Sequence, residues 1–289
     1  MREAHPEIAQ TVQAGGIRTN VHDVGEGAPV VLIHGSGPGV TAWANWRTVI
    51  PALSTSRRVV APDMVGFGFT ERPSDIAYGR EAWVAHLIDL LDAMELDRVD
   101  LVGNSFGGAL SLAFAIRFPQ RVRRLVLMGA AGVEFEITEG LDAVWGYEPS
   151  ARNMRHVMDY FAYDRTLVND ELAELRFKAS IRPGFQEAFS SMFPAPRQRW
   201  VDALASHDDD IRAIPHETLI LHGRDDQVVP LETSLRLHQL IASSQLHVFG
   251  RCGHWVQIER TVGFIRQVQD FLSDADLEPS VQRDRMASR

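Results

Sequence analysis

The sequence contains little cysteine, little positive charge and no long apolar run, and each shortage excludes a class of protein. Cys252 is the only cysteine among 289 residues, which excludes an intrachain disulfide and a cysteine-based metal cluster. Acidic residues outnumber basic ones by 38 to 29, and the net charge of -9 argues against binding to nucleic acid or to an anionic membrane. No apolar run is long enough to span a membrane, and the opening stretch MREAHPEIAQ has no apolar signal region, so we expect a cytoplasmic protein.

Short buried strands alternate with helices through the first half of the chain. Apolar runs predict strands at 29–35, 99–103 and 124–130, and residues 58–68 are predicted to be a further strand that runs into a glycine loop. A helix is predicted at 83–94, where apolar residues recur at i, i+3, i+4 and i+7, and another at 106–118, before a proline. This alternation predicts an α/β fold with a mostly parallel sheet and helices on both faces.

A helical insertion interrupts the alternation. Residues 134–209 carry helical patterns but no convincing strand, whereas strands resume at 218–223 and 246–250. We therefore expect a core formed by 1–133 and 210–273, with 134–209 as a helical cap over the carboxyl edge of the sheet. Residues 274–289 are polar and charged, and we expect a disordered tail there.

The stretch LVGNSFGGAL places Ser105 between a predicted strand and a predicted helix, with Gly103 and Gly107 two residues away on either side. A G-x-S-x-G turn in this setting is typical of a nucleophile elbow, which forces strained backbone angles on the serine. The alternative is a strand-to-helix turn whose glycines merely permit close packing. We interpret Ser105 as a nucleophile.

A serine hydroxyl needs a base, and the base needs an acid to orient it. His254 follows a late strand in VFGRCGHW, and Asp225 and Asp226 follow the strand 218–223 in LHGRDDQVVP. Both loops leave the carboxyl edge of the predicted sheet, and the order Ser…Asp…His is that of a catalytic triad on such a sheet. We choose Asp226 as the acid and expect Asp225 to face solvent.

The negative charge that develops on a substrate carbonyl oxygen needs hydrogen-bond donors. The backbone N–H of Phe106, directly after the nucleophile, is one candidate. The second is the backbone N–H of Ser36 in HGSGPG, because small residues keep this loop narrow. We expect the side chain of His34 to be a structural hydrogen-bonding group rather than a catalyst.

These motifs together resemble the α/β-hydrolase family. The motifs HGSGPG, APDMVGFGFT, GNSFGG, GRDDQVVP and CGHW span most of its core. HGSGPG…WANW with GNSFGG and CGHW is similar to a narrower family, the meta-cleavage product hydrolases of aromatic degradation. The cap stretch, which begins GLDAVWGYEP, resembles the branch that acts on products of monocyclic aromatics, as 2-hydroxymuconate semialdehyde hydrolase does. The resemblance covers roughly residues 8–273.

The resemblance implies hydrolysis of a carbon–carbon bond in a 2-hydroxy-6-oxo-dienoate, with release of 2-hydroxypenta-2,4-dienoate and a small acid. It assigns Arg176 in ELRFKAS as the cation for the substrate carboxylate, a solvated helix arginine being the alternative. It assigns polar substrate contacts to Asn45, Asn104 and Trp255; for Asn104 the alternative is capping of the turn, and for Trp255 core packing. At the far end of the pocket we expect apolar residues from the cap and from loops after strands, for which core packing is again the alternative: Leu141, Trp145, Val201 and Val228.

Two other functions fit parts of the pattern. A serine carboxylesterase would use the same triad, and a non-catalytic ligand receptor would keep the scaffold; the CGHW and GNSFGG contexts, Arg176 and the complete triad favour the carbon–carbon bond hydrolase. No cofactor or metal is expected, because histidines and carboxylates do not stand at ligand spacing on a common helix face. The expected partners are a small-molecule dienoate and, in a homo-oligomer, further copies of the chain.

Overall fold

The computed structural model describes residues 5–273, so the predicted tail at 274–289 lies outside the described residues. Eight strands form one sheet in the order β1-β2-β4-β3-β5-β6-β7-β8. The pairs β1–β2 and β2–β4 are antiparallel, and the other neighbouring pairs are parallel. The strands are β1 Gln10–Ala14, β2 Ile17–Val24, β3 Pro29–Ile33, β4 Arg58–Pro62, β5 Val99–Asn104, β6 Val122–Met128, β7 Thr218–Gly223 and β8 Ser244–Phe249.

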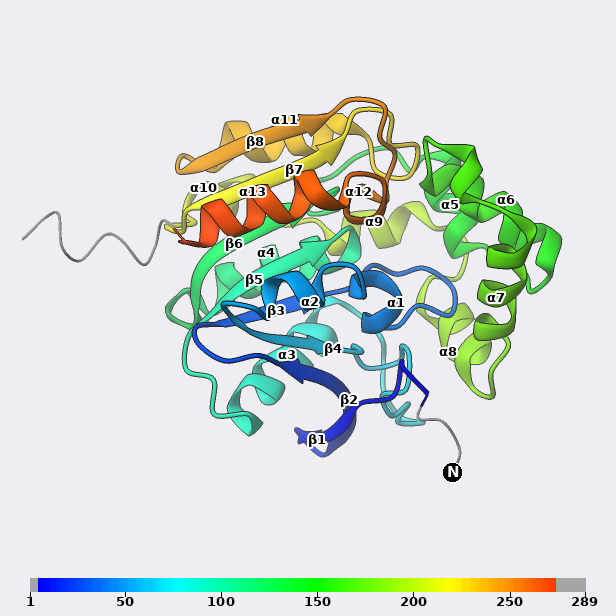
Figure 1. The fold of residues 1–289 in the computed structure, drawn as a ribbon, viewed down its shortest axis with the longest axis horizontal. Helices are drawn as coiled ribbons and strands as arrows, with labels where there is room; N and C mark the ends of the chain where they lie inside the picture. Colours follow the sequence, from blue (N-terminus) through cyan, green and yellow to red (C-terminus); the bar gives the residue numbers. More distant parts are fainter. Residues whose placement is uncertain (1–4, 274–289) are drawn as a thin grey trace, which may run out of the picture.

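Helices cover both faces of the sheet, as the alternating pattern predicts (Figure 1). In β3, Val31 and Ile33 belong to the core on one face, and Val30 and Leu32 belong to the core on the other, because successive strand residues point to opposite sides. The first face packs against α3 Arg80–Ala93, α4 Phe106–Arg117, α10 Asp208–Arg212 and α11 Leu231–Leu240, and the second against α1 Ala42–Trp46, α2 Ile50–Leu53, α12 Val256–Glu259 and α13 Thr261–Ser273. Among residues 5–273, no helix is both long enough and apolar enough to cross a membrane.

Between β6 and β7 the chain leaves the sheet and forms further helices without a strand. These are α5 Glu139–Trp145, α6 Ala151–Phe161, α7 Asp170–Ser180, α8 Phe185–Met192 and α9 Gln198–Leu204, after which α10 returns to the first face of the sheet. Helices α5 to α8 lie beyond the ends to which the β5, β6 and β7 arrows point (Figure 1), and from here on we call these helices the cap, a smaller part of the chain than the predicted cap at 134–209. The cap therefore faces the loops that follow the parallel strands.

Candidate active site

Ser105 lies at the sharp turn between β5 and α4, in a backbone conformation that is rare outside glycine. Its φ is 55° and its ψ is -115°. The turn is held because the Ser105 amide donates to Met128 O at 2.8 Å, while the Ser105 carbonyl accepts from Ala131 N at 3.2 Å. Neither flanking glycine has room for a side chain: a Cβ on Gly103 or on Gly107 would lie 2.3 Å from a backbone oxygen. The spacing of the elbow motif is thus set by close backbone packing.

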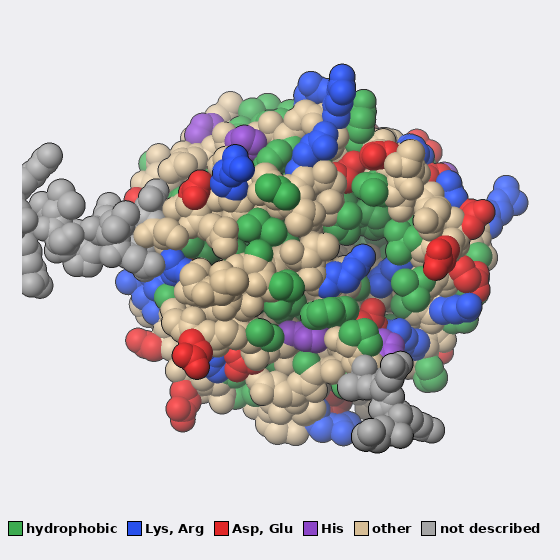
Figure 2. Space-filling model, viewed as in Figure 1, with side chains coloured by type: hydrophobic (Ala, Val, Ile, Leu, Met, Phe, Trp, Pro, Cys, Tyr) green, Lys and Arg blue, Asp and Glu red, His purple; other side chains and the backbone are tan. Residues whose placement is uncertain are grey.

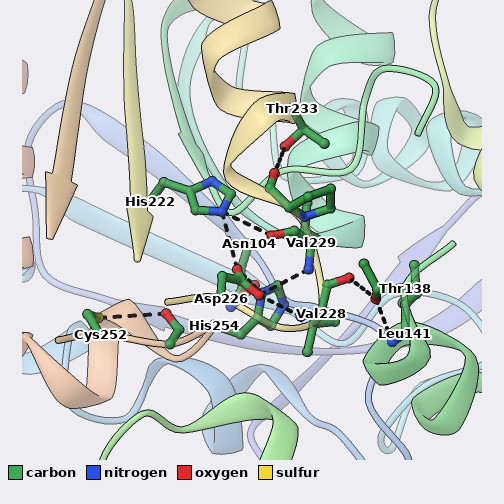
Figure 3. A network of polar contacts seen from close by, with 12 residues as sticks. Asn104, Thr138, Leu141, His222, Asp226, Val228, Val229, Thr233, Cys252 and His254 are labelled. Atoms are coloured by element: carbon green, nitrogen blue, oxygen red, sulfur yellow. Dashed lines mark hydrogen bonds and ion pairs between the residues drawn. The ribbon is translucent and has the colours of Figure 1, made fainter. Parts of the chain in front are cut away.

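His254 and Asp226 come from the loops after β8 and β7 and meet at the same edge of the sheet (Figure 3). His254 Nδ1 donates to Asp226 Oδ2 at 2.7 Å. The other carboxylate oxygen of Asp226 accepts the amides of Val228 and Val229 at 2.8 and 3.0 Å. Burial acts to raise the pKa of Asp226, but the charge and hydrogen bond of His254, with His222 beside it, outweigh burial and leave that pKa below its ordinary value. Asp226 is therefore an ionised carboxylate that fixes the orientation of the His254 ring.

The neighbouring Asp225 has a different task. Its Oδ2 accepts the amide of Cys252 at 3.3 Å and lies 3.5 Å from Arg224, so it joins the two loops while part of its side chain faces solvent. It makes no contact with His254 among the described residues. The choice of Asp226 as the partner of the histidine agrees with this geometry, whereas the expectation that Asp225 faces solvent is wrong in part, because its side chain is only 29% exposed.

A cavity of about 270 Å³ lies between the cap and the edge of the sheet, with Ser105 and His254 in its wall. Basic and hydrophobic side chains lie side by side where the cap meets the core, and the surface is hollowed there (Figure 2). The cap contributes apolar side chains to the wall, namely Leu141, Val144, Met154, Met158, Phe161 and Leu172. A mostly apolar cavity with a few convergent polar groups is typical of a small-molecule site.

Arg176 reaches this cavity from α7. Its Nη2 donates to Gly39 O at 2.8 Å, and its Nη1 lies 3.9 Å from Glu7 Oε1. Burial lowers the pKa of Arg176 to about 10, which still leaves it protonated at neutral pH. The arrangement places a fixed cation in the same cavity as the serine.

The two predicted oxyanion donors lie beside the elbow. The amide of Phe106 opens α4, where helix N–H groups have no partner within the helix, and Ser36 lines the cavity. Neither amide has a hydrogen-bond partner within residues 5–273. His34 Nδ1 donates to Gly35 O at 2.7 Å and its Nε2 accepts from Met64 N at 3.0 Å, so its side chain is structural, as expected.

Residues 28–261 match the family model of the α/β-hydrolase fold. A 2-hydroxy-6-oxo-2,4-heptadienoate hydrolase of Pseudomonas putida strain F1 is 79% identical over 276 residues, which cover 96% of this chain and 100% of that protein. A 2-hydroxymuconate semialdehyde hydrolase of Pseudomonas sp. strain CF600 is 66% identical, with 94% of this chain and 96% of that protein covered. The chain belongs to the meta-cleavage product hydrolases.

The likeness extends to a solved structure of the family. The meta-cleavage product hydrolase CumD from Pseudomonas fluorescens IP01, a serine-to-alanine mutant complexed with acetates, superposes with a TM-score of 0.93 at 63% identity and covers 94% of this chain and 100% of that chain. The meta-cleavage product hydrolase described here therefore shares both core and cap with that enzyme.

Three amide side chains of this meta-cleavage product hydrolase line the cavity, and one polar atom of each has no hydrogen-bond partner in the part of the chain that the structure describes. These atoms are Asn45 Nδ2, Asn104 Oδ1 and Gln257 Oε1. The side chains also touch one another: Asn104 Nδ2 donates to Asn45 Oδ1, and Gln257 Nε2 donates to the Asn45 carbonyl, each at 3.4 Å. A buried polar atom without a partner costs about 1–3 kcal/mol, so these atoms favour a ligand that pairs with them. Sequence analysis missed Gln257, whose only signal is its place two residues after Trp255.

The other predicted pocket residues divide into two groups. Trp255, Leu141 and Val228 line the cavity. Trp145 and Val201 do not, and their prediction as pocket residues is wrong: both are buried, Val201 within the core cluster and Trp145 behind Ser36. Between residues 5 and 273, no group of three or more His, Cys, Asp or Glu side chains is placed to hold a metal ion.

Proposed function

We propose that this enzyme hydrolyses the carbon–carbon bond beside the 6-oxo group of 2-hydroxy-6-oxo-dienoates, in the degradation of aromatic compounds. The observation that carries the proposal is that Arg176 and Ser105 line one cavity. Such a substrate carries a permanent carboxylate, and burying that charge is costly unless a cation meets it. The planar fork of arginine suits a carboxylate with an adjacent 2-oxo oxygen.

In the first step, the proton of the substrate 2-hydroxyl is lost and a proton is added at C5, which gives the ketone. Arg176 holds the carboxylate and the 2-oxo oxygen. The unpaired atoms of Asn45 and Asn104 supply polar partners for the same end of the substrate. This step makes the bond between C5 and C6 breakable, because the electron pair released onto C5 is then delocalised to the 2-oxo oxygen.

In the second step, an oxygen nucleophile adds to C6. His254 accepts a proton either from Ser105, which then forms an acyl intermediate, or from water that attacks directly. The amides of Ser36 and Phe106 donate to the oxyanion on C6. Cleavage of the C5–C6 bond yields 2-hydroxypenta-2,4-dienoate, and the net addition of water leaves C6 as a carboxylic acid.

We propose hydrogen or a small alkyl group on C6 of the physiological substrate. The cavity volume of about 270 Å³ is just below the range of roughly 300–1,000 Å³ common for ligand sites. The Pseudomonas putida relative is named for a heptadienoate, whose C6 carries a methyl group, and the CF600 relative for a semialdehyde, whose C6 carries hydrogen.

A turnover panel tests the proposal. The purified enzyme is given ring-cleavage products that differ only in the substituent on C6 (hydrogen, methyl, ethyl, isopropyl and phenyl), with p-nitrophenyl acetate as a neutral ester. We expect kcat/KM to be highest for the small substituents and low for phenyl. Efficient turnover of the ester with none of the dienoates would establish a carboxylesterase, and tight dienoate binding without turnover would establish a receptor.

The cytoplasmic location and the homo-oligomer expected from the sequence stay predictions. Cell fractionation tests the first. Size-exclusion chromatography with light scattering tests the second, and a mass equal to that of one 32.3 kDa chain would contradict it.

A further inference from the structure

Trp145 is a cap residue that makes a hydrogen bond to the loop after β3. We call this loop, HGSGPG at residues 34–39, the oxyanion loop, because Ser36 in it is a predicted oxyanion donor. It is the last residue of α5 and is 3% exposed. Its indole Nε1 donates to Ser36 Oγ at 3.0 Å. Ser36 follows β3 and lines the cavity, so this bond joins the cap directly to the loop that supplies an oxyanion donor.

The bond limits the directions in which the proton of the Ser36 hydroxyl can point. An indole N–H is a donor only, so the Ser36 oxygen must be the acceptor. The hydroxyl proton is then directed away from Trp145. In the part of the chain that the structure describes, the Ser36 hydroxyl donates to no other group. Because Ser36 lines the cavity, its O–H is free to donate to an oxygen atom of a bound substrate.

A chain of aromatic rings connects Trp145 to the other oxyanion donor. The indole stacks on Phe193, with ring centroids 4.3 Å apart and planes 5° from parallel. Phe193 in turn meets Phe106 edge to face, with centroids 6.4 Å apart at 84°. Phe106 carries the backbone N–H that follows the nucleophile. The indole is therefore fixed by the same packed rings that fix Phe106, which leaves its N–H little freedom to turn.

We propose that Trp145 is a positioning residue, which orients the Ser36 hydroxyl so that it donates to the oxygen on C6 of the substrate alongside the amides of Ser36 and Phe106. For dienoates, this inference rests on the function proposed above. Donors aimed beforehand at developing charge lower the barrier, because they need no reorganisation during the reaction. The carbonyl oxygen of an ester would accept hydrogen bonds from the same three donors, so we expect Trp145 to affect the turnover of esters as well.

The test removes each end of the bond separately. Trp145→Phe keeps an aromatic ring on Phe193 but removes the N–H, and Ser36→Ala removes the hydroxyl but keeps the amide. We expect each change to lower kcat about tenfold on 2-hydroxy-6-oxo-2,4-heptadienoate and on p-nitrophenyl acetate, with KM within about twofold. This is less than the roughly 10²- to 10³-fold loss seen when a main oxyanion donor is removed, because both amides remain.

A double-mutant cycle separates positioning from packing. If Trp145 acts through the Ser36 hydroxyl, Trp145→Phe has no further effect on kcat in the Ser36→Ala background. The matched control is Trp200→Phe, which removes an indole N–H that donates to Pro194 O at 2.7 Å and touches neither donor, and its kcat should equal that of the wild type. Thermal unfolding of each variant shows whether it is folded.

Three results would overturn the inference. Losses that multiply in the double variant would show that Trp145 acts by packing. A change in KM with unchanged kcat would make it a determinant of pocket shape, and a Ser36→Ala enzyme with wild-type kcat would show that the hydroxyl takes no part, even if Trp145→Phe did not fold. Failure of the wild type on dienoates alone would refute the proposed function, but the ester measurements would still decide the role of Trp145.

Discussion

Replacing Arg176 with glutamine distinguishes an enzyme built for dienoates from a general serine hydrolase. The Arg176 side chain is 18% exposed and is anchored on Gly39 O, so the cation is in place before a substrate arrives. Removing one partner of a buried charge pair costs about 2–5 kcal/mol. At about 1.4 kcal/mol per tenfold, this corresponds to roughly 30- to 4000-fold in kcat/KM. Because Glu7 at 3.9 Å already offsets part of the charge, we expect a loss in the lower part of that range, roughly 30- to 300-fold.

The assay compares kcat/KM for 2-hydroxy-6-oxo-2,4-heptadienoate and for p-nitrophenyl acetate, a neutral ester that makes no such ion pair. Arg176→Gln should leave ester turnover within a few-fold of the wild type. The matched control is Arg182→Gln, because Arg182 pairs with the same Glu7 at 2.5 Å but does not line the cavity. Equal losses on both substrates, or the same loss in the control, would show that Arg176 is structural and would refute the reasoning.

The remaining predictions concern the catalytic triad and Gln257, one of the amide side chains that line the cavity. Ser105→Ala and His254→Ala should each lower kcat by roughly a thousandfold or more while the protein stays folded, and one-tenth of wild-type turnover in either would contradict the triad. Asp226→Asn should lower kcat by at least roughly a hundredfold, because it disturbs the tautomer and orientation of His254, whereas Asp225→Asn should act mainly on thermal stability; the reverse outcome would identify Asp225 as the acid. Gln257→Leu removes an unpaired buried oxygen, so it should raise the unfolding temperature slightly and lower dienoate kcat/KM about tenfold, and unchanged kinetics would exclude a substrate contact.

Buried strands could be predicted from the sequence, whereas the antiparallel hairpin at one end of the sheet could not. Every residue of β5 and of β7 is buried, and strands buried on both faces are rich in apolar residues, as LVG in β5 and LIL in β7 show. The hairpin of β1 and β2 was missed. Four of the five residues of β1 remain at least partly exposed, so polar residues such as Gln10 and Thr11 occupy strand positions and hide the apolar alternation.

The same distinction explains which parts of the site could be predicted. Ser105 and Asp226 follow the buried parallel strands β5 and β7, and His254 follows the parallel strand β8, so identifying the strands also places these residues at one edge of the sheet. Position along the chain does not determine which way the side chain of a cap residue points. The cap helices are short, and the turns between them determine which side of each helix is turned toward the cavity. The orientation of Trp145 depends on Phe193, a residue 48 positions later that stacks on the indole and directs its N–H at Ser36. Sequence could place this tryptophan near the site, but only the packing shows that it contacts the oxyanion loop and not the substrate cavity.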